Sequence, residues 1–455
     1  MLNILKFGGT SMNDEHTWRK VFDIISRYKH PVVIVSATAR TTRQLMNAAN
    51  TAVDDLANAA AIAESIGKRH RSLVNNFLAK AKNKRTHSVD EDCEEWIESR
   101  ITNLKKLLEE ISLQKNVSAS QKDAIASTGE QLSAYLFARC GAAYGLDTCW
   151  LDARNIIKTD ANFGAANPEL QQIERTSSLL KNESEKGRIP IIGGFYGENA
   201  RGEITTLGFE GSDYSASLAG AALEAQTIEI WTDVSGIYTC DPRVVEKACP
   251  IAELSFDEAT QLAHAGAKVL HPSTMKPAAS AAIPLLVKNI FAPQQPGTKI
   301  HKTQPNEDGS AKAMAYLEDL TVITVTAEQS SGIEYNFRSQ VLDIFRQTNI
   351  DVKTLTESSA NTISAIVQSI GNVFQLEKAL QKLGKVKRRE KQALISIIGC
   401  SLQGKKRIEE IMLKKNNSPE PAIIFYEEAK NTARIAVPES SLGGAVNNIH
   451  HLFFE

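Results

Sequence analysis

The sequence lacks several features that would place it in a specialised class of protein. Its formal net charge is −1, and no long run of one sign occurs beyond Lys385 to Arg389. We interpret that run as a solvated connection between elements; the alternative, a nucleic-acid patch, fits poorly with the balanced charge. No apolar stretch approaches the roughly 20 residues that a membrane-spanning helix needs. We therefore expect neither nucleic acid nor a membrane as a partner.

Cysteine is sparse and scattered. The 6 cysteines form no CxxC pair and no Cys/His cluster. In a chain of 455 residues this spacing indicates reduced, structural thiols rather than a disulfide framework or a zinc site. The first residues, MLNILKFGGTS, enter an expected strand directly and lack the layout of a signal peptide. We therefore expect a cytoplasmic protein.

Residues 1–297 show an alternation of short apolar runs and helical patterns. This alternation is typical of a layered α/β domain with a mainly parallel sheet. A helical insertion is expected at about residues 54–115. The expected buried strands are Ile4–Phe7, Val32–Ser36, Thr148–Asp152, Ile189–Ile192, Ile228–Thr232 and Leu285–Val287.

The composition changes after residue 297, where proline, glycine and amides predict a linker at 298–314. Beyond it a strand–helix–strand pattern occurs twice, starting near Val322 and near Leu394, with a helix of the second copy expected around Ile408–Met412. The repetition predicts two ferredoxin-like βαββαβ modules, at 315–390 and 391–455. Since edge strands of such modules can pair with another copy, we expect a homodimer or a higher homo-oligomer.

The first expected strand runs into a glycine turn that has the composition of a phosphate site. Gly8 and Gly9 let the backbone approach an anion closely, Thr10 and Ser11 can donate hydrogen bonds, and Lys6 supplies positive charge. A glycine turn alone is weak evidence, and a plain tight turn is the alternative. The flanking Lys and Thr-Ser favour a phosphate site.

Three further segments carry polar and glycine residues after expected strands, where α/β sheets bind ligands. Thr205–Ser215 opens a helix; its Ser212 and Asp213 are either helix caps or, for Asp213, the group that holds a catalytic lysine. Trp231–Arg243 follows the next strand, and a last segment offers Lys268. The histidine beside that lysine precedes a proline and is interpreted as structural.

Together these segments resemble the aspartate kinases of the amino-acid kinase superfamily. The shared motifs, in family order, are KFGGTS, the loop Ser36-Ala37 to Thr42, STGE, TTLG..GSD, WTDVSGIYTCDPR and GAKVLHP. The resemblance extends over nearly the whole chain, because the C-terminal modules look like the paired ACT domains of that family. It implies a three-layer αβα amino-acid kinase fold in residues 1–297, followed by two ACT domains.

The implied activity is ATP-dependent phosphorylation of the side-chain carboxylate of L-aspartate to 4-phospho-L-aspartate. In the family this is the first step of lysine, threonine and methionine biosynthesis, and Mg²⁺ enters with ATP. The residue types agree with this chemistry. A carboxylate with a pKa of about 3.9 is already ionised at neutral pH, so the nucleophile needs no general base. Bringing one anion against another requires cations instead.

The resemblance also implies roles for individual residues, while no set of protein metal ligands follows from it. Glu130 would pair with the ammonium group of aspartate. The catalytic residues would be Lys6, Asp213 and Lys268. ATP and its phosphates would contact Lys6, Gly8, Gly9, Thr10, Ser11, Thr232, Asp233, Tyr238, Arg243 and Lys268. Aspartate would contact Ser36, Thr42, Glu130, Phe195 and Ser212.

The sequence departs from the family at one substrate position. The family reads LGRGGSD where this chain has Phe209 and Glu210 before the GSD, so the arginine that grips a substrate carboxylate is missing. Loss of such a charged hydrogen bond costs about 1.5–3 kcal/mol. We hypothesise that Arg40, or less favourably Arg43, replaces the lost guanidinium; the alternative for Arg40 is a solvent-facing side chain.

The first C-terminal module departs as well. Its loop Ala327–Phe337 lacks the usual glycine-phenylalanine spacing, although Gly332 offers a candidate for binding an amino-acid effector, lysine or threonine. A role in assembly alone is the alternative. Two other functions stay open at this point: a paralogue that acts on another amino-acid carboxylate, and a catalytically silent sensor that binds an amino acid through its ACT modules.

Overall fold

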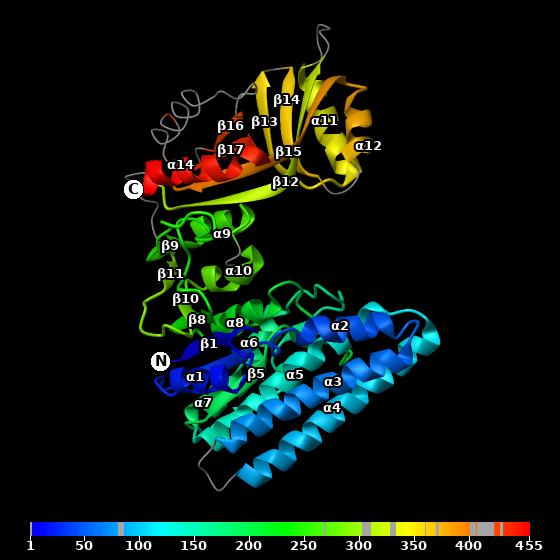
Figure 1. The fold of residues 1–455 in the computed structure, drawn as a ribbon, viewed down its shortest axis with the longest axis vertical. Coiled ribbons are helices and arrows are strands. Elements are labelled where there is room, and N and C mark those ends of the chain that lie inside the picture. The colour runs from blue at the N-terminus through cyan, green and yellow to red at the C-terminus, as the bar shows by residue number, and fades with distance from the viewer. Residues whose placement is uncertain are drawn as a thin grey trace. The chain divides into compact units, whose positions relative to one another are not determined.

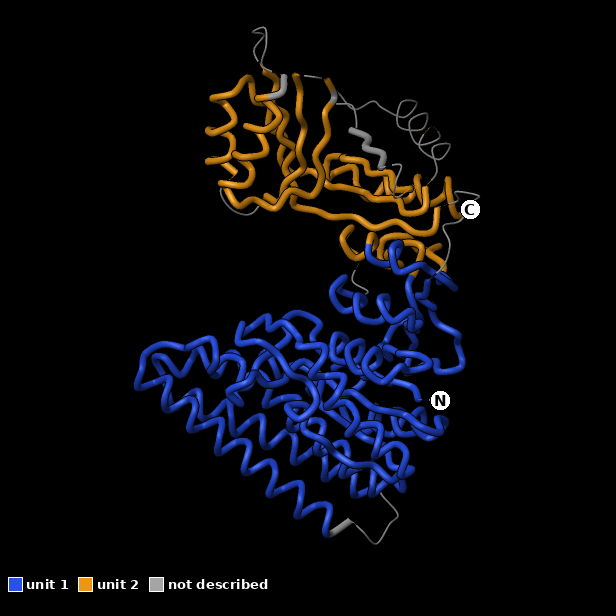
Figure 2. The backbone as a smooth tube through the Cα atoms, turned by 180° about the vertical axis from the view of Figure 1, so that it is seen from behind, with its two compact units in different colours: residues 1–237, 250–260, 269–304 blue, residues 238–249, 261–268, 305–455 orange. Residues whose placement is uncertain are grey.

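The computed structural model describes residues 2–80, 86–267, 270–302, 311–327, 334–359, 361–369, 373–400, 406, 423–427 and 431–455. The chain divides into two compact units, which Figure 2 colours separately. The first contains residues 1–237, 250–260 and 269–304, and the second contains residues 238–249, 261–268 and 305–455.

The first unit is built on an eight-stranded sheet with the order β3-β5-β2-β1-β8-β10-β11-β9. From β3 to β10 neighbouring strands run parallel; β11 is antiparallel to β10. The strands are β1 Asn3–Phe7, β2 Pro31–Val35, β3 Thr148–Trp150, β5 Ile189–Gly193, β8 Thr227–Thr232, β9 Glu253–Ser255, β10 Leu285–Asn289 and β11 Thr298–His301. Every residue of β2 is buried, as its uninterrupted apolar run predicts for a central parallel strand.

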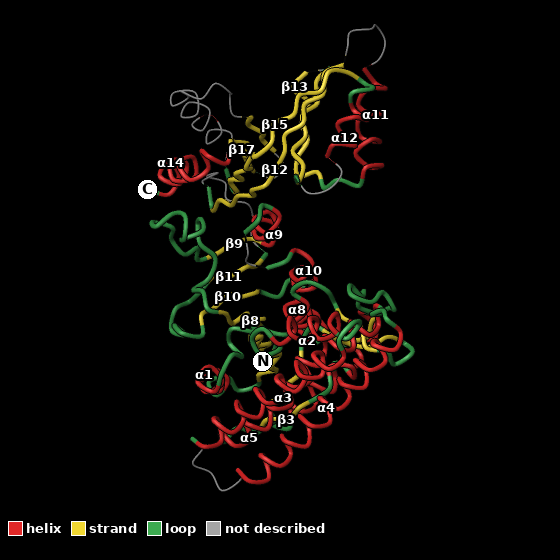
Figure 3. The backbone as a smooth tube through the Cα atoms, turned by 45° about the vertical axis from the view of Figure 1, so that its right-hand side comes forward, coloured by secondary structure: helices red, strands yellow, loops and turns green. Residues whose placement is uncertain are grey.

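Helices surround this sheet, and two of them fill the predicted helical insertion. Figures 1 and 3 show α3 and α4 running side by side along α5. One face of α4 is buried in the main core through Ile97, Ile101, Leu104, Leu108 and Ile111. The helices are α1 Glu15–Ile25, α2 Thr41–Thr51, α3 Leu56–Ala79, α4 Thr86–Gln114, α5 Ala119–Tyr144, α6 Leu170–Thr176, α7 Ser178–Glu185, α8 Gly211–Ala222, α9 Phe256–His264 and α10 Pro272–Ser280.

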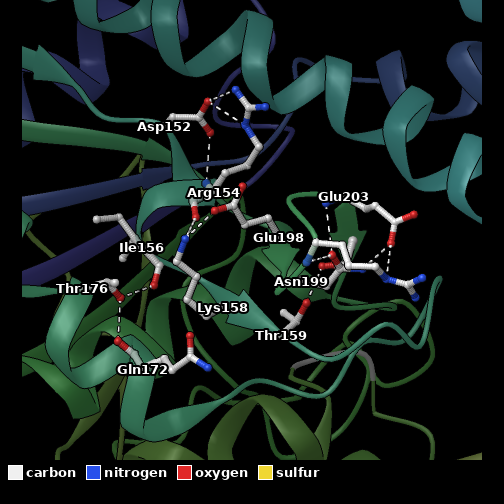
Figure 4. Close-up of polar contacts among 12 residues, drawn as sticks. Asp152, Arg154, Ile156, Lys158, Thr159, Gln172, Thr176, Glu198, Asn199 and Glu203 are labelled. Carbon is white, nitrogen blue, oxygen red and sulfur yellow. Dashed lines mark hydrogen bonds and ion pairs between the residues drawn. The ribbon is translucent and has the colours of Figure 1, made fainter.

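A small second sheet in the first unit contains β4 (Lys158–Thr159), β6 (Tyr196–Asn199) and β7 (Ile204–Thr206). Figure 4 shows the polar contacts around it. The ammonium group of Lys158 donates to the Arg154 carbonyl at 2.8 Å and pairs with the Glu198 carboxylate. These charged contacts join β4 to β6, and the hairpin of β6 and β7 precedes α8 in the chain.

The second unit is built on a six-stranded antiparallel sheet with the order β13-β14-β12-β15-β17-β16. Its strands are β12 Ala313–Ala327, β13 Val352–Ser359, β14 Thr362–Gln368, β15 Gly384–Ile398, β16 Ile423–Glu427 and β17 Thr432–Pro438. Its helices are α11 Glu334–Thr348, α12 Val373–Leu380 and α14 Leu442–Phe454. The helix expected around Ile408–Met412 and the candidate effector residue Gly332 lie outside the described residues.

Two long strands are shared between the halves of this sheet. Leu320–Ala327 of β12 pairs with β14 and with the first part of β15, whereas Ala313–Leu317 pairs with Leu394–Ile398. The register shifts between these two parts of β12, at Leu317 to Val322. The module boundaries expected at 315 and 391 therefore fall inside strands. The linker expected at 298–314 likewise overlaps β11 and the start of β12.

The architecture confirms the expected fold class: an α/β unit with a large, mainly parallel sheet, followed by a C-terminal antiparallel sheet covered by helices. Each half of the C-terminal sheet has its own apolar core, one between the sheet and α11 and α12, the other between the sheet and α14. Within the described parts of the chain no helix is long and apolar enough to cross a membrane.

Candidate active site

The candidate site begins at the carboxyl end of β1. Lys6 is the second-last residue of this strand and is buried, and the turn that follows approaches it closely. A Cβ atom on Gly8 would lie 3.5 Å from the Lys6 ammonium, and one on Gly9 would lie 3.5 Å from the Ala37 carbonyl. The glycines thus leave open space around the lysine that side chains would otherwise fill.

Thr10 and Ser11 complete this turn, but they differ in availability. Thr10 is exposed, whereas the buried Ser11 hydroxyl donates to the Trp231 carbonyl at 3.2 Å. Helix α1 begins only at Glu15, with Asp14 as its cap. Its positive end therefore does not follow the glycine turn directly, and the Asp14 carboxylate already occupies it.

Lys6 is held by an ion pair from the start of α8. Its ammonium lies 2.7 Å from the Asp213 carboxylate, and the two side chains are only 9% and 12% exposed. Asp213 stands in the first turn of this helix, beside the buried Ser212. The ion pair aims the lysine across the end of the sheet, which is the arrangement needed to meet an incoming phosphate with a fixed positive charge.

The start of α8 packs directly against the end of β5. A Cβ atom on Gly194 would lie 2.7 Å from both Cα and Cβ of Ser212. Phe195, next in the chain, has a positive φ of 75° and donates its N–H to the Ser215 hydroxyl at 2.9 Å. Phe195 and Ser212 are thereby placed side by side, at the edge of the sheet where β1 and β2 end.

We expect Gly194→Ala to destabilise the protein and to lower its activity. The added methyl group would overlap the backbone of α8, and overpacking of this kind costs about 1–3 kcal/mol. Thermal unfolding and kinase assays check this result. Gly443→Ala is a matched control, because no atom lies within 4 Å of the Cβ position there. Unchanged unfolding and full activity of Gly194→Ala would contradict the close packing.

Glu130 brings a buried carboxylate to the same edge of the sheet from α5. One carboxylate oxygen accepts the Ala37 N–H at 3.2 Å, and the other has no hydrogen-bond partner among the described residues. The residue is only 4% exposed. Burial raises the pKa of Glu130 to about 8, against the lowering effects of the Ala37 N–H and the Lys6 charge. Within the described residues, one oxygen of this carboxylate is therefore open to a hydrogen bond from a ligand.

The loop after β2 carries the remaining predicted substrate residues. Ser36 and Thr42 are both half-buried, and the Ser36 N–H donates to the Phe7 carbonyl at 3.0 Å. Arg40 caps the N-terminus of α2 with a positive φ of 68° and an exposed side chain. Its backbone therefore shapes the loop, while its guanidinium faces solvent.

The predicted nucleotide residues divide between the two units. Thr232 ends β8, and its hydroxyl donates to the Asp233 carboxylate at 3.1 Å. Tyr238 and Arg243 belong to the second unit, where Arg243 forms a 2.6 Å ion pair with Asp241. Lys268 lies outside the described residues. Thr232 and Asp233 thus join Lys6 at the carboxyl ends of neighbouring parallel strands.

The two residues that replace the family's arginine motif have distinct surroundings. Phe209 is 78% exposed, and its ring meets the His271 ring edge-on at a centroid distance of 6.0 Å. Glu210 accepts a hydrogen bond from the His271 N–H, and burial raises its pKa. His271 caps α10, as its interpretation as a structural residue predicts. Glu210 therefore has a structural partner.

Arg69, which lies in α3 of the helical insertion, is not among the site residues predicted from the sequence. Arg69 of α3 donates to the hydroxyl groups of Thr38, in the loop after β2, and of Thr41, the first residue of α2. Only the packing of α3 over that loop reveals the contact. An arginine flanked by another basic residue and a histidine on a long helix otherwise has the pattern of a surface position.

The chain is similar to known proteins of one family. Residues 1–289 match the amino acid kinase family. Lysine-sensitive aspartokinase 3 of Escherichia coli (strain K12) is 30% identical over 465 residues, covering 99% of each chain. Chloroplastic aspartokinase 1 of Arabidopsis thaliana is 30% identical over 475 residues, covering 99% of this chain and 80% of the plant protein.

Solved structures give the same result. E. coli aspartokinase III in complex with aspartate and ADP (R-state) matches with a TM-score of 0.78 at 28% identity, over 100% of both chains. The same enzyme in complex with lysine and aspartate (T-state) matches with a TM-score of 0.77. The chain therefore belongs to the amino acid kinase family and, within it, to the aspartokinases.

Proposed function

We propose that this protein transfers the γ-phosphoryl group of ATP to the side-chain carboxylate of L-aspartate, giving 4-phospho-L-aspartate. The observation that carries the proposal is that a buried lysine, Lys6, and a buried carboxylate, Glu130, lie at the same edge of the sheet. The Lys6 ammonium is fixed by Asp213, and one oxygen of the buried Glu130 carboxylate has no hydrogen-bond partner among the described residues. The first suits a transferred phosphoryl group, and the second suits the ammonium of an amino acid.

The chemistry follows from these groups. The attacking carboxylate is ionised at neutral pH, so no base is required. Glu130 binds the substrate ammonium and thereby orients the side chain toward the phosphate. Lys6 stabilises the negative charge that gathers on the phosphoryl oxygens, and Asp213 keeps the lysine from moving. Thr232 and Asp233 contribute to nucleotide binding, with Tyr238, Arg243 and Lys268 as the further proposed contacts.

We propose that Mg²⁺ enters with ATP, where it would supply positive charge beside the phosphates. Mg²⁺ is usually held by one or two carboxylates together with phosphate oxygens and water. Asp233, which follows β8, would be the carboxylate that fits this role, since Asp213 is already paired with Lys6. Among the described residues no cluster of three or more His, Cys, Asp or Glu side chains forms a metal site by itself.

The C-terminal unit is proposed to regulate the kinase and to assemble it. The E. coli relative is named lysine-sensitive, and its structure has been solved with lysine bound. We propose that lysine is the effector here, with threonine as the alternative. The strands β13 and β16 are the edges of the six-stranded sheet and offer pairing sites for a second copy in a homodimer. A cytoplasmic location stays a prediction.

An acyl-phosphate trap tests the activity. Purified protein, ATP, Mg²⁺ and hydroxylamine are incubated with aspartate, glutamate, acetylglutamate or no substrate. We expect hydroxamate with aspartate alone, and less of it when lysine is added. Signal with another carboxylate would identify a paralogue whose specificity changed at Phe209 and Glu210. Nucleotide binding without any hydroxamate would identify a silent sensor.

A further inference from the structure

The further inference concerns Arg69, which reaches out of the helical insertion to the loop after β2. Its guanidinium donates to the hydroxyl of Thr41 and, at 3.5 Å, to that of Thr38. Both threonines are buried, and their hydroxyl oxygens lie 2.5 Å apart. Thr38 is also bonded to the buried His70 at 3.1 Å. The guanidinium is therefore held in one orientation by a network of neutral groups.

Arg69 differs in this respect from the other arginine of the same helix segment. Arg71 forms ion pairs with Glu94 at 2.6 Å and Glu98 at 2.8 Å. Within the described parts of the chain, no carboxylate lies within ion-pair distance of Arg69, although its side chain is half-buried and burial lowers its pKa. Partly burying a charge without a counter-ion is unfavourable, so a site of this kind is suited to an anion from solution.

The position of this cation fits the substrate. The loop that Arg69 contacts also binds Glu130, through the Ala37 N–H at 3.2 Å. A Cβ atom on Gly129, the neighbour of Glu130, would lie 2.9 Å from Ala37 and 3.2 Å from Thr41. Glu130 and Arg69 therefore contact neighbouring residues of one short segment, Glu130 at Ala37 and Arg69 at Thr38 and Thr41. An α-amino acid presents an ammonium and a carboxylate on one carbon atom, which is a matching pair of charges.

We propose that Arg69 binds the α-carboxylate of the aspartate substrate, with Thr38 and Thr41 holding its guanidinium in place. The inference rests on the proposed function and assigns the specificity-determining group for its substrate. In this assignment Arg69 takes the role of the family's arginine, whose position is occupied here by the exposed Phe209. Arg40, the candidate suggested by the sequence, is exposed and stands at the end of α2 without a hydrogen bond from its side chain to the helix end.

The test compares aspartate with its α-amide, which keeps the ammonium and the reacting side-chain carboxylate but lacks the α-carboxylate charge. The wild-type protein is expected to prefer aspartate by at least tenfold in kcat/KM. Arg69→Gln is expected to lower kcat/KM for aspartate at least tenfold, because the charged, two-pronged contact is lost. The same variant should leave kcat/KM for the α-amide within twofold and KM for ATP unchanged.

Controls separate binding from structure. Lys68→Gln removes an exposed cation from the adjacent position of α3 and should leave both substrates unaffected. Arg69→Lys retains a positive charge and a donor for the threonines, so it should fold and show the same change in preference to a smaller degree. Thermal unfolding of each variant checks its folding.

Two results would overturn the assignment. An equal loss with both substrates in Arg69→Gln would mean that Arg69 only supports the loop. A loss of preference in Arg40→Gln, with Arg69→Gln unaffected, would assign the role to Arg40. Failure of the wild-type protein to phosphorylate aspartate would be distinguishable from both, because it would overturn the proposed function and this inference with it.

Discussion

Replacing Lys6 by methionine is expected to lower kcat about a hundred- to a thousand-fold, the usual cost of removing a fixed charge that stabilises a transition state. Lys6 is buried at the end of β1 and lies 2.7 Å from Asp213, so no solvent-exposed cation can take its place. Methionine has a similar length and keeps the apolar contacts of the strand. The loss should therefore appear in kcat, and the variant should also unfold at a lower temperature, because Asp213 is left almost buried without its counter-ion.

Steady-state kinetics and thermal unfolding check this prediction together. Lys29→Met provides the control, because Lys29 is an exposed lysine of the same unit. Its kinetics should match those of the wild-type protein. If Lys6→Met keeps more than a tenth of the wild-type kcat while the protein stays folded, Lys6 is not the group that meets the transferred phosphate.

Replacing Glu130 by glutamine is expected to raise KM for aspartate about ten- to a hundred-fold. A hydrogen bond to a charged group contributes about 1.5–3 kcal/mol, and the glutamine amide cannot attract the substrate ammonium. Glutamine can still accept the Ala37 N–H that Glu130 accepts at 3.2 Å, so the loop should stay in place. KM for ATP, measured in parallel, should not change.

The pH dependence gives a sharper test of Glu130. Its pKa is raised to about 8 in the folded protein, so below that pH the carboxyl group must lose a proton before it can pair with the ammonium. KM for aspartate in the wild-type protein should therefore rise by about tenfold per pH unit as the pH falls below 8. The Glu130→Gln variant should show a flat profile. A flat profile in the wild-type protein would contradict the assignment.

The same pKa has a consequence for stability. Because the folded-state pKa of about 8 lies above the ordinary value of 4.5, the neutral form of Glu130 is the one that folding favours. Its contribution to stability is fully present below pH 4.5 and is lost as the pH rises through 8. Without substrate, we therefore compare the free energy of unfolding of Glu130→Gln with that of the wild-type protein at each pH. The variant should gain stability relative to the wild-type protein between pH 5 and pH 9. Denaturant unfolding at the two pH values measures this.

Much of the fold and several site residues were predictable from the sequence alone. Strands that are buried on both faces appear as uninterrupted apolar runs, and the helices between them have their own period. The order of strands and helices therefore indicated a parallel α/β sheet. The candidate residues near Lys6, Ser36, Phe195 and Thr232 follow such strands directly. Parallel strands end at one edge, so these residues gather there.

Only the tertiary structure shows which charged groups are buried and how they are paired. The segment around Glu130 reads as an ordinary helix, and its raised pKa arises from burial beneath the loop after β2. Arg69 is likewise one basic residue among several on a long helix until α3 packs over that loop. Burial of a charge depends on segments far apart in the chain, which local periodicity does not encode.

The C-terminal sheet illustrates the same limit. The repeated pattern near Val322 and Leu394 predicted two successive modules. In the structure, Ala313–Leu317 pairs with Leu394–Ile398, so a strand that precedes the first half of the sheet completes the second half. The sequence by itself determined the elements and the residues that follow them. Only the tertiary structure decided how strands are shared between the halves of the sheet and which charged side chains are buried. Strand pairing and burial both depend on contacts between distant parts of the chain.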